Sequence, residues 1–180
     1  MILLDTNVIS EIMRERPDPV VRSWLRAHAR NEFWTSSIVV AELLSGIDLM
    51  PPGGKQTELR AAVEGMITQD FNGQILKFDL HAARHYGKIL SYRRTIGRPI
   101  SEMDALIAAT AKTNGAKLAT RNISHFESCG VDLIDPPTQP FLPPRLRPDR
   151  LPAAWMPTTP KQSRPKPTPG SPVEHSINPI

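Results

Sequence analysis

The sequence predicts an α/β fold in which a central parallel sheet carries helices on both faces. Three observations predict it. Short apolar runs alternate with longer segments whose apolar residues have helical spacing. Several of the short runs are closed at once by polar residues. The alternation continues over about 135 residues, which is a normal size for one domain, and parallel strands need helical crossovers of this kind.

The predicted strands are short and evenly spread along the chain. They lie at 2–4, 32–35, 75–78, 117–120 and 131–134. The first, Ile2-Leu3-Leu4, is an unbroken apolar run of the type that is buried on both faces of a parallel sheet. The predicted helices lie at 7–15, 19–30, 37–50, 55–71, 81–96 and 101–115, with a turn or short helix at 123–128.

Caps and helix-breaking residues set the helix ends. Pro19 suits the first turn of the second helix, and Ser36 or Ser37 suits the N-cap of the third. The sequence PPGG at 51–54 separates the third helix from the fourth, and Gly115 is a C-terminal stop for the last long helix.

Residues 136–180 differ in composition from the rest of the chain. They contain 14 of the 19 prolines and six of the 22 Lys and Arg residues, but only two of the 18 acidic residues. We expect a disordered, polyproline-like tail in this segment. Residues 1–135, the expected folded domain, balance 16 basic against 16 acidic residues, so the net charge of +4 comes from the tail.

Asp5 is the first candidate functional residue. It follows the first strand directly, and ligands bind outside the carboxyl ends of the strands in open α/β sheets. The alternative is structural, because Asp5 or Asn7 could simply cap the helix that follows.

Glu42 is the second candidate. It is the only charged residue between Ser37 and Ile47, on a helix that is apolar nearly all round and is expected to be buried on several sides. A buried carboxylate without a partner is costly, so we expect a positive group beside it. The alternative is a Glu at the helix edge that is solvated or paired with an arginine.

Asp104 and Asn122 complete the candidate set. Asp104 lies in the first turn of a helix, close to the strand ends, but Ser101-x-x-Asp104 also has the pattern of a capping box. Asn122 comes shortly after the fourth strand, as Asp5 follows the first, although it could be only a turn residue.

Three carboxylates at one edge of a sheet repel one another, and a divalent cation resolves this. All-oxygen ligands select hard ions, so we expect Mg²⁺, with Mn²⁺ as a possible substitute. Such an ion serves phosphate chemistry. There is no glycine-rich phosphate loop, which argues against nucleoside triphosphate hydrolysis.

The cysteine count and the lengths of the apolar runs indicate the cellular compartment. Cys129 is the single cysteine, so no internal disulfide can form and a reducing compartment is natural. The chain starts directly with a predicted strand, and no apolar run approaches the length of a membrane helix. We therefore expect a cytoplasmic protein without a membrane contact.

Four segments, in order, resemble the motifs of the PIN-domain toxins of bacterial toxin–antitoxin pairs, the VapC and FitB group. These are ILLDTNVISE at 2–11, SSIVVAELLSGI at 36–47, GRPISEMDALIAATA at 97–111 and LATRNISHF at 118–126. The resemblance covers about residues 1–135. It implies a three-layer α/β/α PIN domain and an Mg²⁺-dependent endoribonuclease that cuts RNA until an antitoxin protein binds it.

The resemblance also implies roles for single residues. Asp5, Glu42 and Asp104 match the acidic site of the family, with Asp5 and Asp104 as metal ligands and Glu42 holding a water or a second ion. Thr120 would be a supporting hydroxyl, and Asn122 falls where some members have an acid. His125 departs from the family, because members with Asn at position 122 often have Asp three residues later.

Three hypotheses remain open from the sequence. The leading one is the endoribonuclease toxin. The second is a catalytically impaired PIN-fold module that only binds antitoxin, a hypothesis motivated by His125 and the tail, and the third is a DNA-directed nuclease. The apolar helices near 36–50 and 55–71 also predict exposed hydrophobic surface and hence a homodimer.

Overall fold

A computed structural model describes residues 1–136, and the expected tail at 136–180 lies outside the described residues except for Pro136. The described part contains a five-stranded parallel sheet in the order β3-β2-β1-β4-β5. The strands are β1 (Ile2–Leu4), β2 (Phe33–Ser36), β3 (Ile75–Leu76), β4 (Lys117–Ala119) and β5 (Leu133–Ile134).

The strand order reverses between β1 and β4. The chain runs outward from β1 through β2 to β3, and then returns to the other side of β1 to form β4 and β5. Ligand crevices of open parallel sheets lie at such a reversal, outside the carboxyl ends of the strands. Leu4 pairs with Ala119, so Asp5 and Thr120 leave the sheet side by side.

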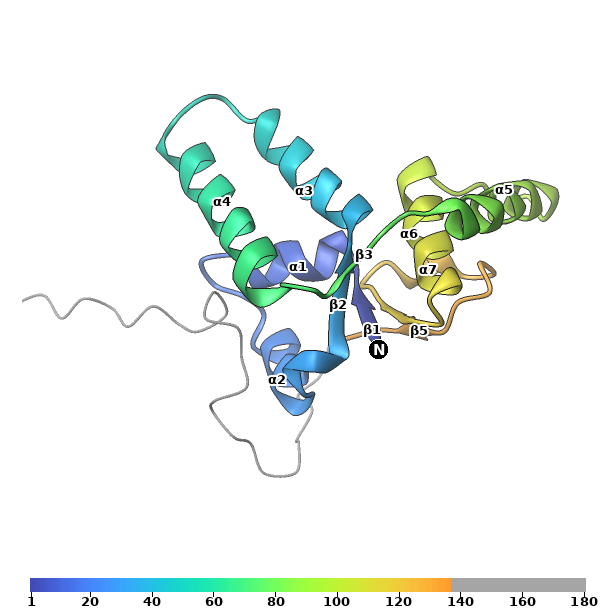
Figure 1. Cartoon of the computed structure of the whole chain (residues 1–180), viewed down its shortest axis with the longest axis horizontal. Coiled ribbons are helices and arrows are strands. Elements are labelled where there is room, and N and C mark those ends of the chain that lie inside the picture. Colours follow the sequence, from blue (N-terminus) through green and yellow to red (C-terminus); the bar gives the residue numbers. More distant parts are fainter. Residues whose placement is uncertain (137–180) are drawn as a thin grey trace, which may run out of the picture.

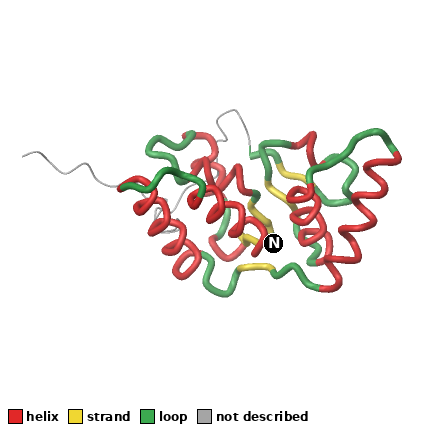
Figure 2. Tube along the Cα trace, turned by 90° about the horizontal axis from the view of Figure 1, so that it is seen from above, coloured by secondary structure: helices red, strands yellow, loops and turns green. Residues whose placement is uncertain are grey.

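Helices cover the sheet on both sides (Figure 1). The chain between β1 and β3 forms α1 (Thr6–Ile12), α2 (Pro19–Ala27), the 3₁₀ turn η1 (Arg30–Glu32), α3 (Ser37–Asp48), α4 (Gly54–Gly65) and the π-helical segment η2 (Met66–Asp70). The later part forms α5 (Leu80–Thr95), α6 (Glu102–Thr113) and α7 (Ile123–Phe126). Figure 2 shows the strands between these two groups of helices, and α3 contacts α6. None of the helices within residues 1–136 combines the length and apolar character needed to span a bilayer.

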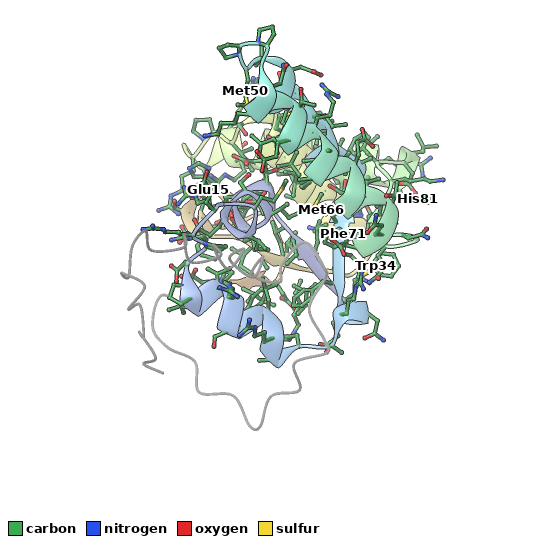
Figure 3. The ribbon with its side chains drawn as sticks, turned by 90° about the vertical axis from the view of Figure 1, so that its left-hand side faces the viewer. Glu15, Trp34, Met50, Met66, Phe71 and His81 are labelled. Atoms are coloured by element: carbon green, nitrogen blue, oxygen red, sulfur yellow. The ribbon has the colours of Figure 1, made fainter. Side chains whose placement is uncertain are left out.

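The core lies between the sheet and these helices. Leu3 and Leu4 of β1 are fully buried, as expected for the central strand of a parallel sheet. In α6, the buried face is built largely from alanines, which let this helix pack closely. Met66 and Phe71 are buried beneath α4, whereas Met50 lies at the far end of the α3–α4 hairpin (Figure 3).

The structure confirms the predicted fold and the order of its elements, but it corrects several boundaries. The helix expected at 7–15 ends at Ile12, and the helix expected at 19–30 ends at Ala27. The single helix expected at 55–71 is α4 followed by a π-helical turn, where the Phe71 N–H donates to the Met66 carbonyl. Strands β3 and β5 have two residues each, half the predicted length.

Candidate active site at the carboxyl edge of the sheet

Asp5 both caps a helix and occupies the crevice at the strand reversal. It is the N-cap of α1, and its Oδ1 accepts the Thr6 N–H at 2.8 Å. Its Oδ2 accepts the Thr120 hydroxyl at 2.7 Å and the Asn7 side-chain amide at 2.8 Å. Asp5 therefore does cap α1, as the structural alternative held, but its second oxygen also accepts a hydrogen bond from Thr120 at the end of the neighbouring strand β4.

Burial raises the pKa of the Asp5 carboxyl to about 6, from an ordinary value of 3.8. Desolvation is the largest cause, and the hydrogen bonds from Thr120 and Thr6 oppose it. The negative charges of Asp104 and Glu42 raise the pKa further. The three candidate carboxylates thus lie close enough to repel one another.

Glu42 lies on α3 at the edge of this crevice. Its side chain is half-buried, and its Oε2 accepts a hydrogen bond from the Thr6 hydroxyl. The expectation that α3 is buried on several sides is wrong: the helix buries only one stripe, Val39, Leu43 and Ile47. Glu42 therefore keeps partial access to water, and within residues 1–136 it has no ion-pair partner.

Asp104 lies in the first turn of α6 and is half-buried. The Ser101 hydroxyl oxygen accepts the Asp104 N–H at 3.1 Å, so the expected cap exists. The Asp104 carboxylate is used differently, because its Oδ2 lies 3.2 Å from Nδ1 of His125. The backbone of Asp104 thus serves the helix, while its side chain faces the position at which this sequence departs from the family.

Asn122 follows β4, and none of its hydrogen bonds within residues 1–136 is to one of the three carboxylates. Its backbone N–H donates to the Thr120 hydroxyl oxygen at 3.0 Å. Its side chain is exposed and makes no hydrogen bond to any other residue that the structure describes. A catalytic role for Asn122 stays a prediction.

Thr6 and Asn7 contribute to the site in ways that the sequence did not predict. The sequence indicated only a helix-capping role for Asn7 and no role for Thr6. Asn7 donates to Asp5 and, at 3.0 Å, to the Thr120 hydroxyl, and its Oδ1 accepts the Arg121 N–H at 3.1 Å. It therefore joins the ends of β1 and β4. The signal was the polar triplet Asp5-Thr6-Asn7 directly after a buried strand.

A buried ion pair holds the two strand ends together further from the crevice. Glu11, on α1, is almost fully buried, and its Oε2 lies 2.9 Å from Nη1 of Arg121. Its other oxygen accepts the Asp18 N–H at 3.0 Å, which fixes the start of α2. This pair ties α1 to the segment that carries Thr120 and Asn122.

Two cavities flank the carboxylates. The larger, about 1090 Å³, lies along α1, α3 and α4 and is lined by Thr6 and Glu42. Glu15, labelled in Figure 3, lies at the same cavity just beyond α1. The smaller, about 360 Å³, is lined by Asp104 and His125.

The donor set fits a hard divalent cation. In the part of the chain that the structure describes, no three His, Cys, Asp or Glu side chains converge closely enough to enclose an ion. Mg²⁺ does not need such an enclosure, because it keeps several waters and uses one or two carboxylates. Asp5 and Asp104 are the two carboxylates that the sequence assigns to such an ion, and the pKa of Asp5 is raised chiefly by desolvation and further by the charges of Asp104 and Glu42, which a cation would offset.

The fold and these carboxylates define an α/β protein with an acidic site at the strand reversal, and comparison with known proteins identifies its family. Residues 2–128 match the model of the PIN domain, so the chain belongs to the PIN-domain family. VapC nucleases of this family depend on a metal ion.

Similar proteins include named toxins and ribonucleases. VapC ribonuclease Y4jK of Sinorhizobium fredii is 41% identical over 136 residues, 76% of this chain and 97% of that protein. Toxin FitB of Neisseria gonorrhoeae is 41% identical, with 76% and 98% covered. The solved structure of FitAcB from Neisseria gonorrhoeae has a TM-score of 0.70 at 41% identity, covering 76% of this chain and 98% of that chain.

The raised pKa of Asp5 predicts how the stability of the metal-free protein depends on pH. The folded state binds the Asp5 proton more tightly than the unfolded state, so stability from this group is highest below pH 4 and is lost as pH rises to about 6. Asp5→Asn should remove this loss and raise the free energy of unfolding at pH 7.5 by about 3 kcal/mol, since one pKa unit corresponds to about 1.4 kcal/mol.

The measurement is urea unfolding in EDTA between pH 4 and 7.5. Asp132→Asn, which removes an exposed carboxylate, is the matched control and should follow the wild type. A metal-free Asp5→Asn protein that is less stable than wild type at pH 7.5 would contradict the assignment of a destabilising buried charge.

Proposed function

We propose that this chain is a metal-dependent endoribonuclease and the toxin component of a toxin–antitoxin pair. The observation that supports it most strongly is the group of three carboxylates, Asp5, Glu42 and Asp104, at the strand reversal. We assign Mg²⁺ to Asp5 and Asp104, with Mn²⁺ as a substitute, and we assign Asn122 to the rim of the catalytic site.

A bound Mg²⁺ would supply charge neutralisation on the phosphodiester and a more acidic water. The chain supplies the geometry. Thr120, from the neighbouring strand end, and Asn7, from α1, hold Asp5 in one orientation. Thr6 fixes the Glu42 carboxylate beside the open cavity, where it can accept a proton from the attacking water.

Single-stranded RNA is the proposed substrate. The tRNA(fMet)-specific endonuclease VapC of Shigella flexneri, 27% identical over 128 residues, supports this choice together with the VapC ribonucleases. A ribonuclease of this kind meets its substrate in the cytoplasm, which agrees with a single cysteine. DNA cleavage is the competing activity.

The proposed protein partner is a cognate antitoxin. Solved relatives are complexes, including DNA-bound VapBC of Salmonella typhimurium with a TM-score of 0.63 and 28% identity. Glu42 lines the larger cavity, so an antitoxin arginine that enters there would pair with the carboxylates and displace the metal. Leu49, Tyr92 and Ile96 are exposed apolar side chains, which supports a homodimer.

The second hypothesis, a catalytically impaired module that binds only the antitoxin, has one specific observation in its favour. His125 faces Asp104, at 3.2 Å, where an additional acid would extend the metal site. A protonated imidazole there would compete with a cation for the same carboxylate.

Removal of a metal ligand should abolish RNA cleavage without loss of the fold. We expect Asp5→Asn and Asp104→Asn to reduce cleavage of labelled single-stranded RNA by about a thousandfold, because several kcal/mol of charge stabilisation are lost. Asp132→Asn should cleave as wild type does. Equal rates in all four proteins would contradict the proposal, and faster cleavage of DNA of the same sequence would favour the DNA-directed alternative.

Metal titration by calorimetry separates the enzyme from the impaired module. Wild type should bind Mg²⁺ and Mn²⁺, and Asp5→Asn should show no such heat. If wild type binds these ions no better than Asp5→Asn, the impaired module is the better account. In that case His125→Asp, which replaces the imidazole beside Asp104 by a carboxylate, should restore binding.

A further inference from the structure

The smaller cavity beside Asp104 contains a buried arginine without an anionic partner. Arg93, on α5, is only 3% exposed, yet it lines this cavity. Its Nε donates to the Arg98 carbonyl at 2.6 Å and its Nη1 donates to the Glu127 carbonyl. A guanidinium has five N–H donors, and within residues 1–136 the side chain of Arg93 makes no other hydrogen bond and no ion pair.

The carboxylates around Arg93 already have partners. Glu127 Oε2 lies 2.8 Å from Nη1 of Arg98, and Asp104 Oδ2 lies 3.2 Å from Nδ1 of His125. Arg93 is therefore the guanidinium of this cavity that, among the described residues, has no carboxylate within ion-pair distance. A buried cation is costly unless an anion pairs with it, so Arg93 favours an anionic ligand at its remaining N–H groups.

The chemistry of the lining fits a phosphate group that belongs to a nucleotide. A planar guanidinium with free N–H groups matches phosphate oxygens in a bidentate manner. Ser124 adds an exposed hydroxyl at the same cavity, and Pro99 and Ile100 add apolar surface on which a sugar can rest. The cavity shares Asp104 with the carboxylate site, so a ligand bound in the cavity lies next to that site.

We propose that this cavity binds a phosphate of the RNA strand next to the phosphodiester that is cleaved, with Arg93 as its buried anchor. The inference rests on the proposed function, because the strand must cross the carboxylates to bring its next phosphate to Arg93. In this proposal, the RNA strand leaves the catalytic site past residues 93, 98 and 124.

The test adds a negative charge to the cavity and keeps Arg93. Replacing Arg93 itself would also leave the Arg98 and Glu127 carbonyls without their hydrogen-bond donor. Ser124 lines the same cavity as Arg93, so the carboxylate of Ser124→Glu is expected to compete with the phosphate. Ser124→Gln has the same size without the charge and is the matched control. Asn31→Glu, exposed in η1 at the amino end of β2, adds the same charge far from the cavity.

The readout is fluorescence anisotropy of labelled single-stranded RNA in EDTA over a range of salt concentrations. Ser124→Glu should bind RNA about tenfold more weakly, and the slope of log affinity against log salt should fall by about 0.7, as for one lost phosphate contact on a single strand. Ser124→Gln and Asn31→Glu should keep the wild-type slope. Ser124→Glu without RNA should also melt at a higher temperature than Ser124→Gln, since its carboxylate pairs with Arg93.

Each contrary outcome has a separate meaning. If wild type cleaves RNA while Ser124→Glu and Ser124→Gln bind it with equal affinity and slope, the inference is overturned and the proposed function stands. If wild type neither binds nor cleaves RNA, the proposed function fails and the RNA assignment fails with it. If inorganic phosphate raises the melting temperature of Ser124→Gln but not of Ser124→Glu, with no difference in RNA binding, the cavity takes a free anion and the RNA assignment is wrong.

Discussion

The burial of the Asp5 carboxylate at the end of the central strand is the constraint on which the candidate site depends. The charge lies in a desolvated position, near two further carboxylates, and its pKa rises to about 6. Such a position is unfavourable for folding alone. The surrounding hydrogen bonds from Thr6, Asn7 and Thr120 offset part of the cost, and in the proposed function a bound cation offsets the rest.

The parallel topology explains why these groups meet. The reversal between β1 and β4 brings Asp5 beside Thr120, although 115 positions separate them in the chain. The Glu11–Arg121 ion pair also joins α1 to the segment that follows β4. Glu42 and Asp104 approach from α3 and α6, which contact each other above the strand ends.

Much of this arrangement follows from sequence, because buried strands, caps and charges on apolar helices have local signals. Asp5 after Ile2–Leu4, Ser36 as the cap of α3 and Gly115 at the end of α6 are local, and the structure has all three. The π-helical turn at 66–70 and the one-sided burial of α3 depend on tertiary packing, which no local pattern contains. The burial of Arg93 was not predicted for the same reason. Helix α5 carries several basic residues, and nothing in the sequence distinguishes the arginine that is buried from those that are exposed.

The most direct test of the central claim is the rate of RNA cleavage by the double variant Asp5→Asn/Asp104→Asn, measured in single turnovers beside both single variants. If the two carboxylates hold one ion, the loss of either removes the same contribution, and the double variant should cleave as slowly as the slower single variant. If the two losses multiply, the carboxylates act independently. That result would contradict a shared metal as the physical basis of the site.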